Sequence, residues 1–466
     1  MAFVTVPGSN GLLEYDNTAS LVAGEVGDGT LSTTTGDPIM SPNYGALDWW
    51  GQNIAASSTN MMVGVPGPGG NTGIVYIHDQ YGEISKQMVN PNISAGTDDN
   101  DDFGASIDID GNTCIVGAPG ELASSGKAYI YNVTSAALLH TLDNPDPDST
   151  PAGDLYGGSV AIDGNYAIVG ARAEDEDGAG SGKAYIYNVT TGALVHTLAN
   201  PNAFDVAAGD AFGHNVSISG NYAAVSAPFE GSPTAGYTGN VYIYNVTTGA
   251  LLHTLDNPNP DAVTLFGFLM AMDGIYLAVQ SPTTYGSVYV FNATTGALLH
   301  TLDNPNTTGS NHYGSAIAID AANEVIVVGN FHDNSQSGLV YVYRVSTGTL
   351  LNTINNGNMV GGAAGDEFGS GVAIMNGKLY VGAKKETYFE SQQGLIYQYQ
   401  YNYTPGEGGT ADVNVYPDAN GTIAGGIRTF TPPNGGNPQK TYVKTRRAGE
   451  TQILGELSKN YYDARV

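Results

Sequence analysis

"YGGSVAIDGNYAIVGA", residues 156–171, is the stretch that decides the fold. Apolar residues alternate with small or polar ones along "YGGSVAID", and Asp163 and Gly164 interrupt this pattern before "YAIVGA" begins. An alternation with a period of two predicts a β-strand, and an Asp-Gly pair suits a tight turn because both residues tolerate a positive φ angle. The stretch therefore predicts two antiparallel strands joined by a hairpin.

Two further strand signals follow in the same unit. "GKAYIYNV" (182–189) and "ALVHTL" (193–198) have the apolar and aromatic composition of strands, and Gly192 between them suits a hairpin with a G1 bulge. We expect each unit to be a four-stranded antiparallel sheet in which consecutive strands pair.

The unit repeats along the chain, and each copy starts with an aromatic residue followed by glycine. These pairs begin at Trp50, Phe103, Tyr156, Phe212, Phe266, Tyr313 and Phe368. The successive spacings are 53, 53, 56, 54, 47 and 55 residues. A period near 50 residues with several strand signals per unit is typical of a propeller blade or of a β-solenoid coil.

The two ends of the repeat region complement each other, which favours a closed ring. After "GLIYQYQYN" (394–402) the seventh repeat lacks a fourth strand, whereas "GTLSTTTGDPIMSPNYGALDWWG" (29–51) parallels "GTLLNTINNGNMVGGAAGDEFG" (348–369). We therefore predict an all-β, seven-bladed β-propeller of four-stranded antiparallel blades, in which residues near 29–35 complete the seventh blade. This divides the chain into an N-terminal arm (1–28), the propeller (29–403) and a C-terminal segment (404–466).

The C-terminal segment has the signals of a small β-rich attachment module. It contains a Pro-Gly-rich hinge "TPGEGG" (404–409), candidate strands "ADVNVYP" (411–417) and "KTYVKTRR" (440–447), and a candidate helix "AGETQILGELSKNYYDA" (448–464). Four basic residues suit contact with an acidic protein surface, or alternatively form a solvated strand face: Lys440, Lys444, Arg446 and Arg447. Together with the N-terminal arm, this segment is expected to attach the propeller to an assembly.

Composition and charge narrow the choice of partners. The chain has 466 residues, 64 Gly, 30 Tyr and a net charge of −29. Residues 1–403 hold 8 Lys and Arg against 38 Asp and Glu, whereas residues 404–466 hold 7 against 6. An acidic body repels phosphate backbones and anionic lipid, so neither nucleic acid nor a membrane is an expected partner. The single Cys114 excludes an intramolecular disulfide, and neither a signal peptide nor a membrane span is recognisable.

One stretch resembles a known family closely. "DDFGASIDIDGNTCIVGAPG" (101–120), followed by "GKAYIYN" (126–132), is similar to the FG-GAP repeat of the integrin α-subunit propeller and of many microbial proteins, including marine phage and bacterial FG-GAP proteins. The resemblance covers about residues 29–403 and implies the seven-bladed propeller. It is less informative about function, because the family spans adhesion receptors, secreted proteins and phage structural proteins.

The calcium sites of that family are not expected here. Calcium-binding members carry an Asp- and Asn-rich loop between strands one and two, whereas this chain has only "DGN" (110–112), "DGN" (163–165) or similar short turns. Two or three residues cannot supply the six to eight oxygen ligands that calcium prefers. We therefore expect no cofactor. The weak candidates for a cation site, or for a solvated acidic loop, are Asp98, Asp99, Asp101 and Asp102.

A recurrent aspartate lies two residues before the aromatic residue of five repeats. It is found at Asp48, Asp101, Asp154, Asp210 and Asp366. Asp side chains commonly hydrogen-bond to nearby turns, so a turn-bonding role is the expected one.

The loops that join strands two to three and four to one share one face of a propeller, and here they vary in length and composition. Variable loops on a rigid scaffold are where recognition is usually located. The binding candidates on this face are the acidic run Glu174, Asp175, Glu176 and Asp177, and the aromatic residues Phe229, Tyr237, Tyr285, Phe331, Tyr388 and Phe389. The acidic run could hold a cation or be solvated, and the aromatic residues could stack on sugars or pack between loops.

The sequence contains no recognisable catalytic arrangement, and we expect no enzyme activity. Four histidines occupy one repeat position on four different blades and are therefore interpreted as structural: His140, His196, His253 and His300. The N-x-T triplets at Asn132, Asn188, Asn245 and Asn292 are interpreted as hairpin residues.

Taken together, these features favour a non-enzymatic structural or adhesion protein. The leading hypothesis is a component of a tailed-phage virion, located in the tail, neck, fibre or capsid decoration, made in the host cytoplasm and present in many copies. Its partners would be other virion proteins through the two ends, and a host-surface glycan or protein through the propeller. The alternatives are a bacterial cell-surface or extracellular adhesin, a carbohydrate-binding protein, a carbohydrate-active enzyme and an assembly spacer without ligand.

Overall fold

We describe the protein from a computed structural model of the whole chain. The description covers residues 2–5, 12–15, 30–32, 39–42, 50–67, 73–92, 101–145, 153–176, 178–201, 209–232, 236–259, 264–282, 285–306, 312–333, 337–356, 365–386, 394–402, 441–447 and 450–457. By its internal contacts the chain forms two compact units, one of residues 30–402 and one of residues 1–29 together with 403–466.

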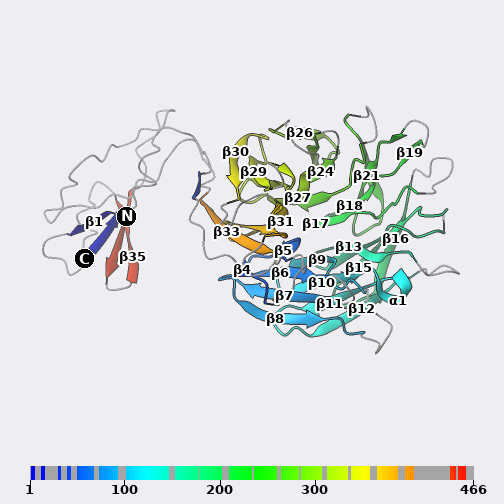
Figure 1. Cartoon of the computed structure of the whole chain (residues 1–466), viewed down its shortest axis with the longest axis horizontal. Coiled ribbons are helices and arrows are strands. Elements are labelled where there is room, and N and C mark those ends of the chain that lie inside the picture. Colours follow the sequence, from blue (N-terminus) through cyan, green and yellow to red (C-terminus); the bar gives the residue numbers. More distant parts are fainter. Residues whose placement is uncertain are drawn as a thin grey trace. The chain divides into compact units, whose positions relative to one another are not determined.

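The larger unit is the predicted seven-bladed propeller, with its sheets arranged around a ring (Figure 1). Blades one to three consist of β5 (Asn53–Ala56), β6 (Asn60–Val65), β7 (Ile74–Asp79) and β8 (Ile84–Val89); β9 (Ser106–Asp110), β10 (Thr113–Ala118), β11 (Lys127–Asn132) and β12 (Leu138–Asp143); and β13 (Tyr156–Asp163), β14 (Tyr166–Ala171), β15 (Lys183–Asn188) and β16 (Leu194–Ala199).

The next three blades follow the same order. They consist of β17 (Val216–Ser219), β18 (Tyr222–Ala227), β21 (Asn240–Asn245) and β22 (Leu251–Asp256); β23 (Met270–Asp273), β24 (Tyr276–Ser281), β25 (Ser287–Asn292) and β26 (Leu298–Asp303); and β27 (Tyr313–Asp320), β28 (Val325–Asn330), β29 (Leu339–Arg344) and β30 (Leu350–Asn355). Blade four carries an extra short pair, β19 (Gly231–Ser232) and β20 (Gly236–Tyr237). Blade two carries the short helical element α1 (Glu121–Ser124).

Blade seven is formed by strands from both ends of the repeat region. Its chain-contiguous strands are β31 (Phe368–Met375), β32 (Lys378–Ala383) and β33 (Leu395–Asn402). β3 (Thr30–Ser32) pairs with one end of β33, where Leu31 lies opposite Tyr401, and β4 (Ile39–Met40) pairs with its other end. These three residues of β3 are the part of the predicted closing stretch that the structure describes, and residues 29 and 33–35 lie outside it.

The aromatic-glycine pair forms a tight turn at the start of each blade. In blade two the Ala105 amide donates to the Asp102 carbonyl at 2.9 Å, and the Gly104 amide donates to the Gly117 carbonyl at 2.9 Å. Gly104 has a φ of 92°, which a type II turn requires at its third residue. The aromatic ring of Phe103 is thereby directed inward and is fully buried. This turn explains why the repeat carries glycine after the aromatic residue.

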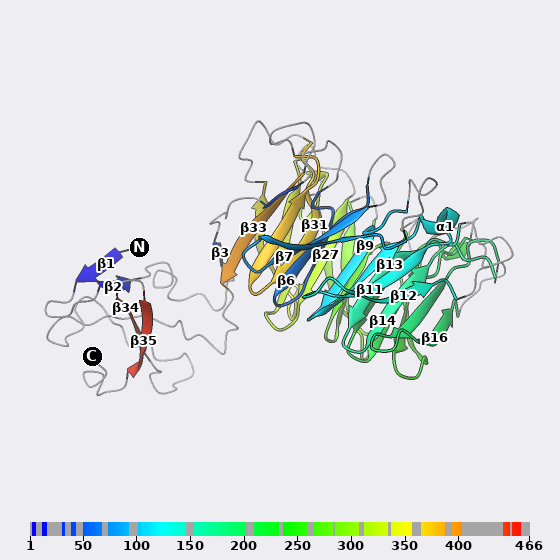
Figure 2. The same cartoon turned by 90° about the horizontal axis from the view of Figure 1, so that it is seen from below.

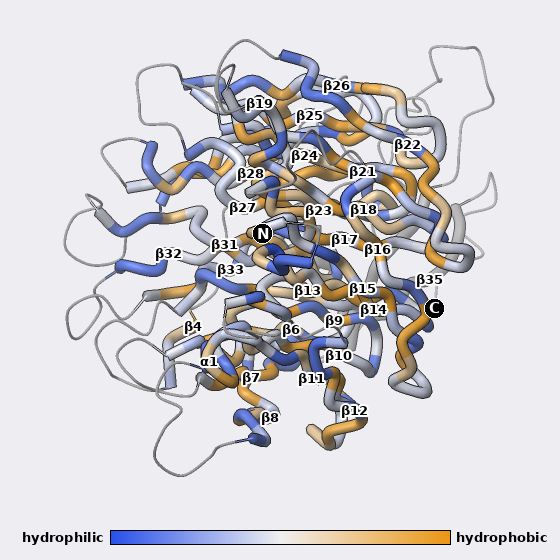
Figure 3. The backbone as a smooth tube through the Cα atoms, turned by 90° about the vertical axis from the view of Figure 1, so that its right-hand side faces the viewer, coloured by the Kyte–Doolittle hydropathy of each residue, from blue (hydrophilic) through white to orange (hydrophobic). Residues whose placement is uncertain are grey.

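The hydrophobic core lies between neighbouring blades. One cluster of buried residues joins Val75 and Ile77 of blade one to Phe103, Val116 and Tyr129 of blade two. Further clusters of the same kind join the later blades, and hydrophobic residues are concentrated along the strands (Figure 3). Since each blade buries its faces against its two neighbours, packing spreads around the ring.

Side chains from one blade satisfy the exposed backbone of the inner strand in the next. Asp108 accepts hydrogen bonds from the Ile162 amide and from the Ile109 amide, each at 2.8 Å, and Ser106 accepts from the Val160 amide at 2.9 Å. Burial raises the pKa of Asp108 to about 6. The inner strands of all seven blades enclose a cavity of about 620 Å³. These bonds cap edge strands that would otherwise leave polar backbone groups without partners.

The repeated histidines join the blades at their outer strands. His140, His196 and His253 contact the backbone carbonyls of Thr190, Thr247 and Thr294 in the following blade, at 3.2, 3.0 and 2.9 Å. Asn188 and Asn245 accept hydrogen bonds inside their hairpins from the amides of Thr191 and Thr248. The structural interpretation of these histidines and of the N-x-T asparagines is confirmed.

The smaller unit contains one four-stranded sheet built from both ends of the chain. Its order is β1 (Ala2–Thr5), β2 (Leu12–Tyr15), β34 (Thr441–Arg447) and β35 (Glu450–Leu457). The predicted strand at 440–447 is confirmed, whereas the predicted helix at 448–464 is wrong, because Glu450–Leu457 is a strand paired with β34. A short isolated helix with Gly455 in its middle is marginal, and β34 offers a complete row of backbone partners. The candidate strand at 411–417 lies outside the described residues.

Candidate functional site

One face of the propeller carries the loops between strands two and three and the crossings between blades. We call it the loop face. In blade two it holds α1, which lies at one end of the blade (Figure 2), whereas the short turn between β9 and β10 at Gly111 lies at the opposite end. Because antiparallel strands alternate in direction, the described ends of the loops between strands two and three and of the crossings between blades lie on this one face. The described side chains of the loop face fall into three groups.

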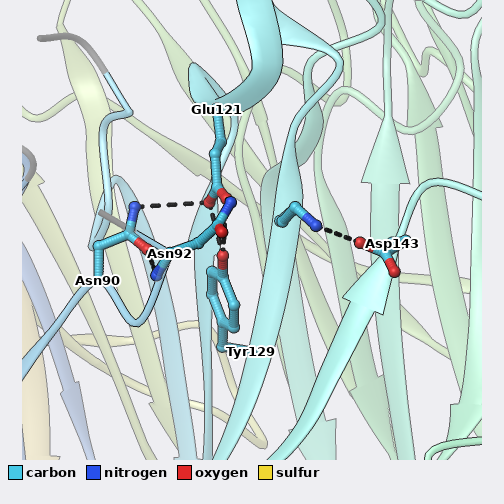
Figure 4. A network of polar contacts seen from close by, with 6 residues as sticks. Asn90, Asn92, Glu121, Tyr129 and Asp143 are labelled. Atoms are coloured by element: carbon cyan, nitrogen blue, oxygen red, sulfur yellow. Dashed lines mark hydrogen bonds and ion pairs between the residues drawn. The ribbon is translucent and has the colours of Figure 1, made fainter. Parts of the chain in front are cut away.

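The first group is a buried carboxylate at the start of the loop between strands two and three. In blade two, Glu121 is 1% exposed and accepts hydrogen bonds from the Tyr129 hydroxyl at 2.9 and 2.6 Å (Figure 4). Asn92 also donates to Glu121, and Asn90 donates to Asp101 at 2.8 Å. The network links the inter-blade crossing to the loop, so it holds the two segments of the face together.

Four other blades repeat this arrangement. The pairs are Glu174 with Tyr185, Glu230 with Tyr242, Asp333 with Tyr341, and Glu386 with Tyr397. Burial raises the pKa of Glu386 to about 7. The sequence analysis missed these carboxylates apart from Glu174, which it took as a surface candidate, although a signal was present. In each of these repeats an acidic residue follows the end of strand two by three positions, in "APGE", "ARAE", "APFE", "NFHD" and "AKKE".

The recurrent aspartate before the aromatic residue bonds to the inter-blade crossing. Asp154, Asp210 and Asp366 accept hydrogen bonds from Asn144, Asn200 and Asn356 at 2.8, 3.0 and 3.0 Å. These residues and Asp101 are thus structural hydrogen-bonding groups, but the partner is an asparagine side chain of the crossing and not the predicted nearby turn, whereas Asp48 lies outside the described residues. Burial, reinforced by Glu230, raises the pKa of Asp210 to about 6. These buried aspartates hold the inter-blade crossings in place on the loop face.

The acidic run in blade three is divided by the fold. Glu174 is fully buried, and its carboxylate lies 3.9 Å from the Lys183 ammonium. Asp175 and Glu176 are exposed, and Glu176 forms an ion pair with Lys183. Asp177 lies outside the described residues. Glu174 is therefore one of the buried carboxylates and is not available to a ligand at the surface.

The second group is an aromatic cluster on blades four and five. Phe229 lies 5.9 Å from Tyr237 and 6.0 Å from His214 between ring centroids, and His214 lies 4.7 Å from Phe268. Tyr237 and Phe268 are each 39% exposed. Burial, together with nearby Arg172, lowers the pKa of His214 to about 4, so this imidazole is neutral at pH 7. The sequence analysis identified two of these rings but not His214 or Phe268.

The other aromatic candidates are dispersed. Tyr285 is exposed on blade five, and its carbonyl accepts a hydrogen bond from Asn304 at 3.0 Å. Tyr388 and Phe389 lie outside the described residues. Phe331 belongs to the third group.

The third group lies on blades six and seven, and we call it the basic–aromatic cluster. It consists of His312, Phe331, His332, Lys384 and Lys385, gathered around Glu367. The His312 ring lies 3.9 Å from His332 and 4.7 Å from Phe331. The Lys384 ammonium lies 4.8 Å from the centre of the Phe331 ring. Of this cluster, only Phe331 was a candidate from the sequence.

Glu367 is the anionic centre of that cluster. Its carboxylate lies 2.6 Å from the Lys385 ammonium, 3.3 Å from that of Lys384 and 3.9 Å from Nε2 of His332. Burial lowers the pKa of both His312 and His332. The neighbouring lysines act in the same direction, whereas the Glu367 carboxylate acts against it without reversing the shift. The lowered pKa favours the neutral form of both imidazoles, which lie beside two lysine side chains and one glutamate.

The remaining candidates give no assembled site. Among the described residues no three His, Cys, Asp or Glu side chains are placed to hold a metal ion. Asp101 is buried against Asn90, Asp102 is half-buried, and Asp98 and Asp99 lie outside the described residues. Lys444, Arg446 and Arg447 lie on β34, of which only the backbone is described, and Lys440 lies outside. In the part of the chain that is described, no helix is long and apolar enough to cross a membrane.

A comparison with known protein families supports the repeat identified in the sequence. The sequence profile of the FG-GAP repeat matches residues 93–131, 147–187 and 202–244, which lie in blades two, three and four and the crossings that precede them. No curated protein sequence matches the chain. The chain thus carries FG-GAP repeats within a seven-bladed β-propeller, an architecture consistent with a non-enzymatic, adhesion-type role.

Proposed function

We propose that this protein is a non-enzymatic adhesion component of a tailed-phage virion. The propeller would present its loop face to a host surface or to a neighbouring subunit. The sheet formed by the two chain ends would attach it to the particle. A rigid propeller is supported by the bonds to the inner strands, by the core between neighbouring blades and, at three junctions, by the histidines of the outer strands.

The observation that carries the adhesion role is the chemistry of the loop face. The chain is strongly acidic, yet Arg172, Lys384 and Lys385 lie on this face together with exposed aromatic rings. Aromatic and cationic side chains held on a rigid scaffold are typical of recognition surfaces. The opposite face carries short, repetitive turns in the described blades, such as Asp163–Gly164.

The two chain ends support the attachment role. Strands from residues 2–15 and 441–457 combine into one sheet, so the module needs both ends of the chain. Residues 404–466 have a charge close to neutral in a chain whose other part is strongly acidic. This difference supports a partner for the ends that differs from the partner of the propeller.

Two experiments test these roles separately. For location, particles purified from cultures that produce the chain are probed with an antibody to the propeller, by immunogold imaging. Labelling of a defined place on tailed particles is expected. Labelling of bacterial envelopes instead would contradict the virion assignment and favour the cell-surface adhesin.

For adhesion, the purified full-length chain is labelled and its binding to candidate host cells is measured. A triple substitution on the loop face, Arg172→Ala with Tyr237→Ala and Phe268→Ala, should lower binding at least fivefold. A matched triple substitution on the outer strands, Lys86→Ala with Leu138→Ala and Leu251→Ala, should leave it within twofold. Equal loss in both variants, or no binding by the unaltered chain, would contradict an adhesive loop face.

A further inference from the structure

The basic–aromatic cluster of blades six and seven concentrates positive charge in a chain that has very little. Residues 1–403 hold only 8 Lys and Arg. Lys127 is paired with Asp143 near the edge of blade two, and Lys183 with Glu176 in blade three. Lys384 and Lys385, by contrast, are adjacent, follow the end of β32 directly and share one carboxylate. Among the described residues, two ammonium groups against one carboxylate leave one positive charge in excess.

Glu367 holds the two lysines in place. Its side chain is 3% exposed, and its backbone has a φ of 57°, a conformation that residues other than glycine rarely adopt. The buried carboxylate lies within 3.3 Å of both ammonium groups. The acids adjacent in sequence have other partners, since Asp366 accepts from Asn356 and Glu386 from Tyr397. The ammonium pair is therefore organised before any ligand arrives, which lowers the entropic cost of binding an anion.

The rings beside the lysines supply a second kind of contact. His312, Phe331 and His332 lie within 4.7 Å of one another between centroids, and all three are half-buried. Neutral imidazoles can both donate and accept hydrogen bonds, which suits hydroxyl groups. Their faces and that of Phe331 offer apolar area next to the charged groups. Lys385, at 39% side-chain exposure, is open to solvent at the edge of these rings.

We propose that the basic–aromatic cluster binds a carboxylate-bearing sugar residue of an acidic polysaccharide. The sugar carboxylate would lie against the ammonium groups of Lys384 and Lys385. Its hydroxyls would bond to His312 and His332, and its apolar C–H face would pack on the rings. An acidic peptide also carries carboxylates, but it lacks the ring hydroxyls that paired neutral imidazoles recognise. This inference rests on the proposed adhesive function, because it names the ligand class of the same face.

The experiment measures binding of the full-length chain to polygalacturonate, alginate and polysialic acid, with dextran as the neutral control and poly-glutamate as the acidic peptide. Binding to at least one acidic polysaccharide is expected, weakening with salt, at least tenfold tighter than to dextran and poly-glutamate. Lys385→Ala should weaken it at least tenfold. Lys86→Ala, which removes an exposed lysine from the outer strand β8, should change it less than twofold. His332→Ala, with both lysines intact, should weaken it at least threefold.

Three results would overturn the inference: absence of binding to all three acidic polysaccharides, equal binding to poly-glutamate, or equal loss with Lys86→Ala and Lys385→Ala. The melting temperature of each variant is measured alongside, so that loss of folding is recognised, and Lys385→Gln replaces any variant that unfolds. Cell binding separates the two hypotheses. If the chain adheres to cells and Lys385→Ala adheres equally, the ligand assignment is wrong and the adhesive function stands.

Discussion

Gly382 in blade seven lies directly against the carbonyl oxygen of Gly51 in blade one, so close that a Cβ atom on Gly382 would overlap it. The same relationship joins Gly117 to Gly157 and Gly170 to Gly213 around the ring. The glycine of strand two in one blade thus faces the glycine of the aromatic-glycine turn in the next. At Gly382 this contact links the last blade to the first, where the ring closes.

Gly382→Ala should therefore destabilise the propeller. The added methyl group meets backbone, which cannot move aside without separating blades seven and one, and overpacking of this kind costs about 1 to 3 kcal/mol. The melting temperature of the propeller transition, followed by circular dichroism, measures the effect. Gly111→Ala is the control, because nothing lies within 4 Å of its Cβ and only the φ of 53° opposes the substitution. If both variants melt alike, the inter-blade contact is not what requires glycine.

Ala136→Gly should stabilise the protein. Ala136 has a φ of 54° in the hairpin between β11 and β12, a conformation that costs an L-residue about 1 kcal/mol or more. Glycine removes this strain. Part of the stabilisation is offset because glycine also increases the conformational entropy of the unfolded chain, so the net stabilisation is up to about 1 kcal/mol. The free energy of unfolding in urea measures it.

The reverse substitution at an equivalent hairpin provides the comparison. Gly249 has a φ of 70°, and its Cβ would stand 2.8 Å from the His196 ring of the preceding blade. Gly249→Ala should therefore destabilise by more than the Ala136→Gly gain. At the hairpin of Ala136 the preceding blade carries Lys86 in place of histidine. A neutral or destabilising Ala136→Gly would show that the strain is absent.

Glu386 should make stability depend on pH. Burial raises its pKa from 4.5 to about 7, so between these values the folded protein holds a proton that the unfolded chain has released. Stability therefore falls as pH rises from 4.5 to 7, by about 1 to 3 kcal/mol for this group. Glu386→Gln carries no titrating proton, and its unfolding free energy should lack this part of the decline.

The comparison is made as a difference between the two proteins at each pH, because Asp108 and Asp210 also titrate near 6 in the folded state and contribute equally to both. A difference that does not change between pH 4.5 and 7 would mean that Glu386 is ionised in the folded protein throughout this range.

Tyr129→Phe should weaken the attachment between the loop and the sheet in blade two. It removes the hydroxyl that donates to the buried Glu121 carboxylate, and loss of a hydrogen bond to a buried charged group costs about 1.5 to 3 kcal/mol. Tyr81→Phe, at a tyrosine that is 75% exposed, should cost almost nothing. Limited proteolysis of the loop after α1 reports local loosening, and equal cleavage of the two variants would show that the carboxylate pair does not fasten the loop.

The sequence predicted the propeller because its fold signals are local and repeated. The alternation within each strand, the hairpin residues and the aromatic-glycine pair are each confined to a few neighbouring positions, and seven copies agree. The helix expected at 448–464 was wrong because Glu450–Leu457 forms a hairpin with the preceding strand β34, and β34 in turn pairs with β2 from the other end of the chain. An unrepeated segment offers no second copy against which to check such a prediction.

The candidate site was less predictable than the fold, because its contacts are not encoded in a local repeated pattern. Of the basic–aromatic cluster, Phe331 was a candidate, whereas Glu367 and Lys384 had no local signal, since Glu367 meets Lys384 within the folded blade seven and Lys384 meets Phe331 of blade six. Glu174 had the appearance of a surface acid within an acidic run, but Tyr185 and Lys183 enclose it.

The amino-acid sequence alone determined the number of blades, their strand order and the face on which variable loops lie. Both signals, the period of two within a strand and the period of about 50 residues between units, are visible in the local order of residue types. Only the tertiary structure decided which acids are buried, that Glu367 draws two lysines together, and that both chain ends share one sheet. Burial and ionic contact depend on how strands, loops and neighbouring blades pack against one another, which the local residue pattern does not specify.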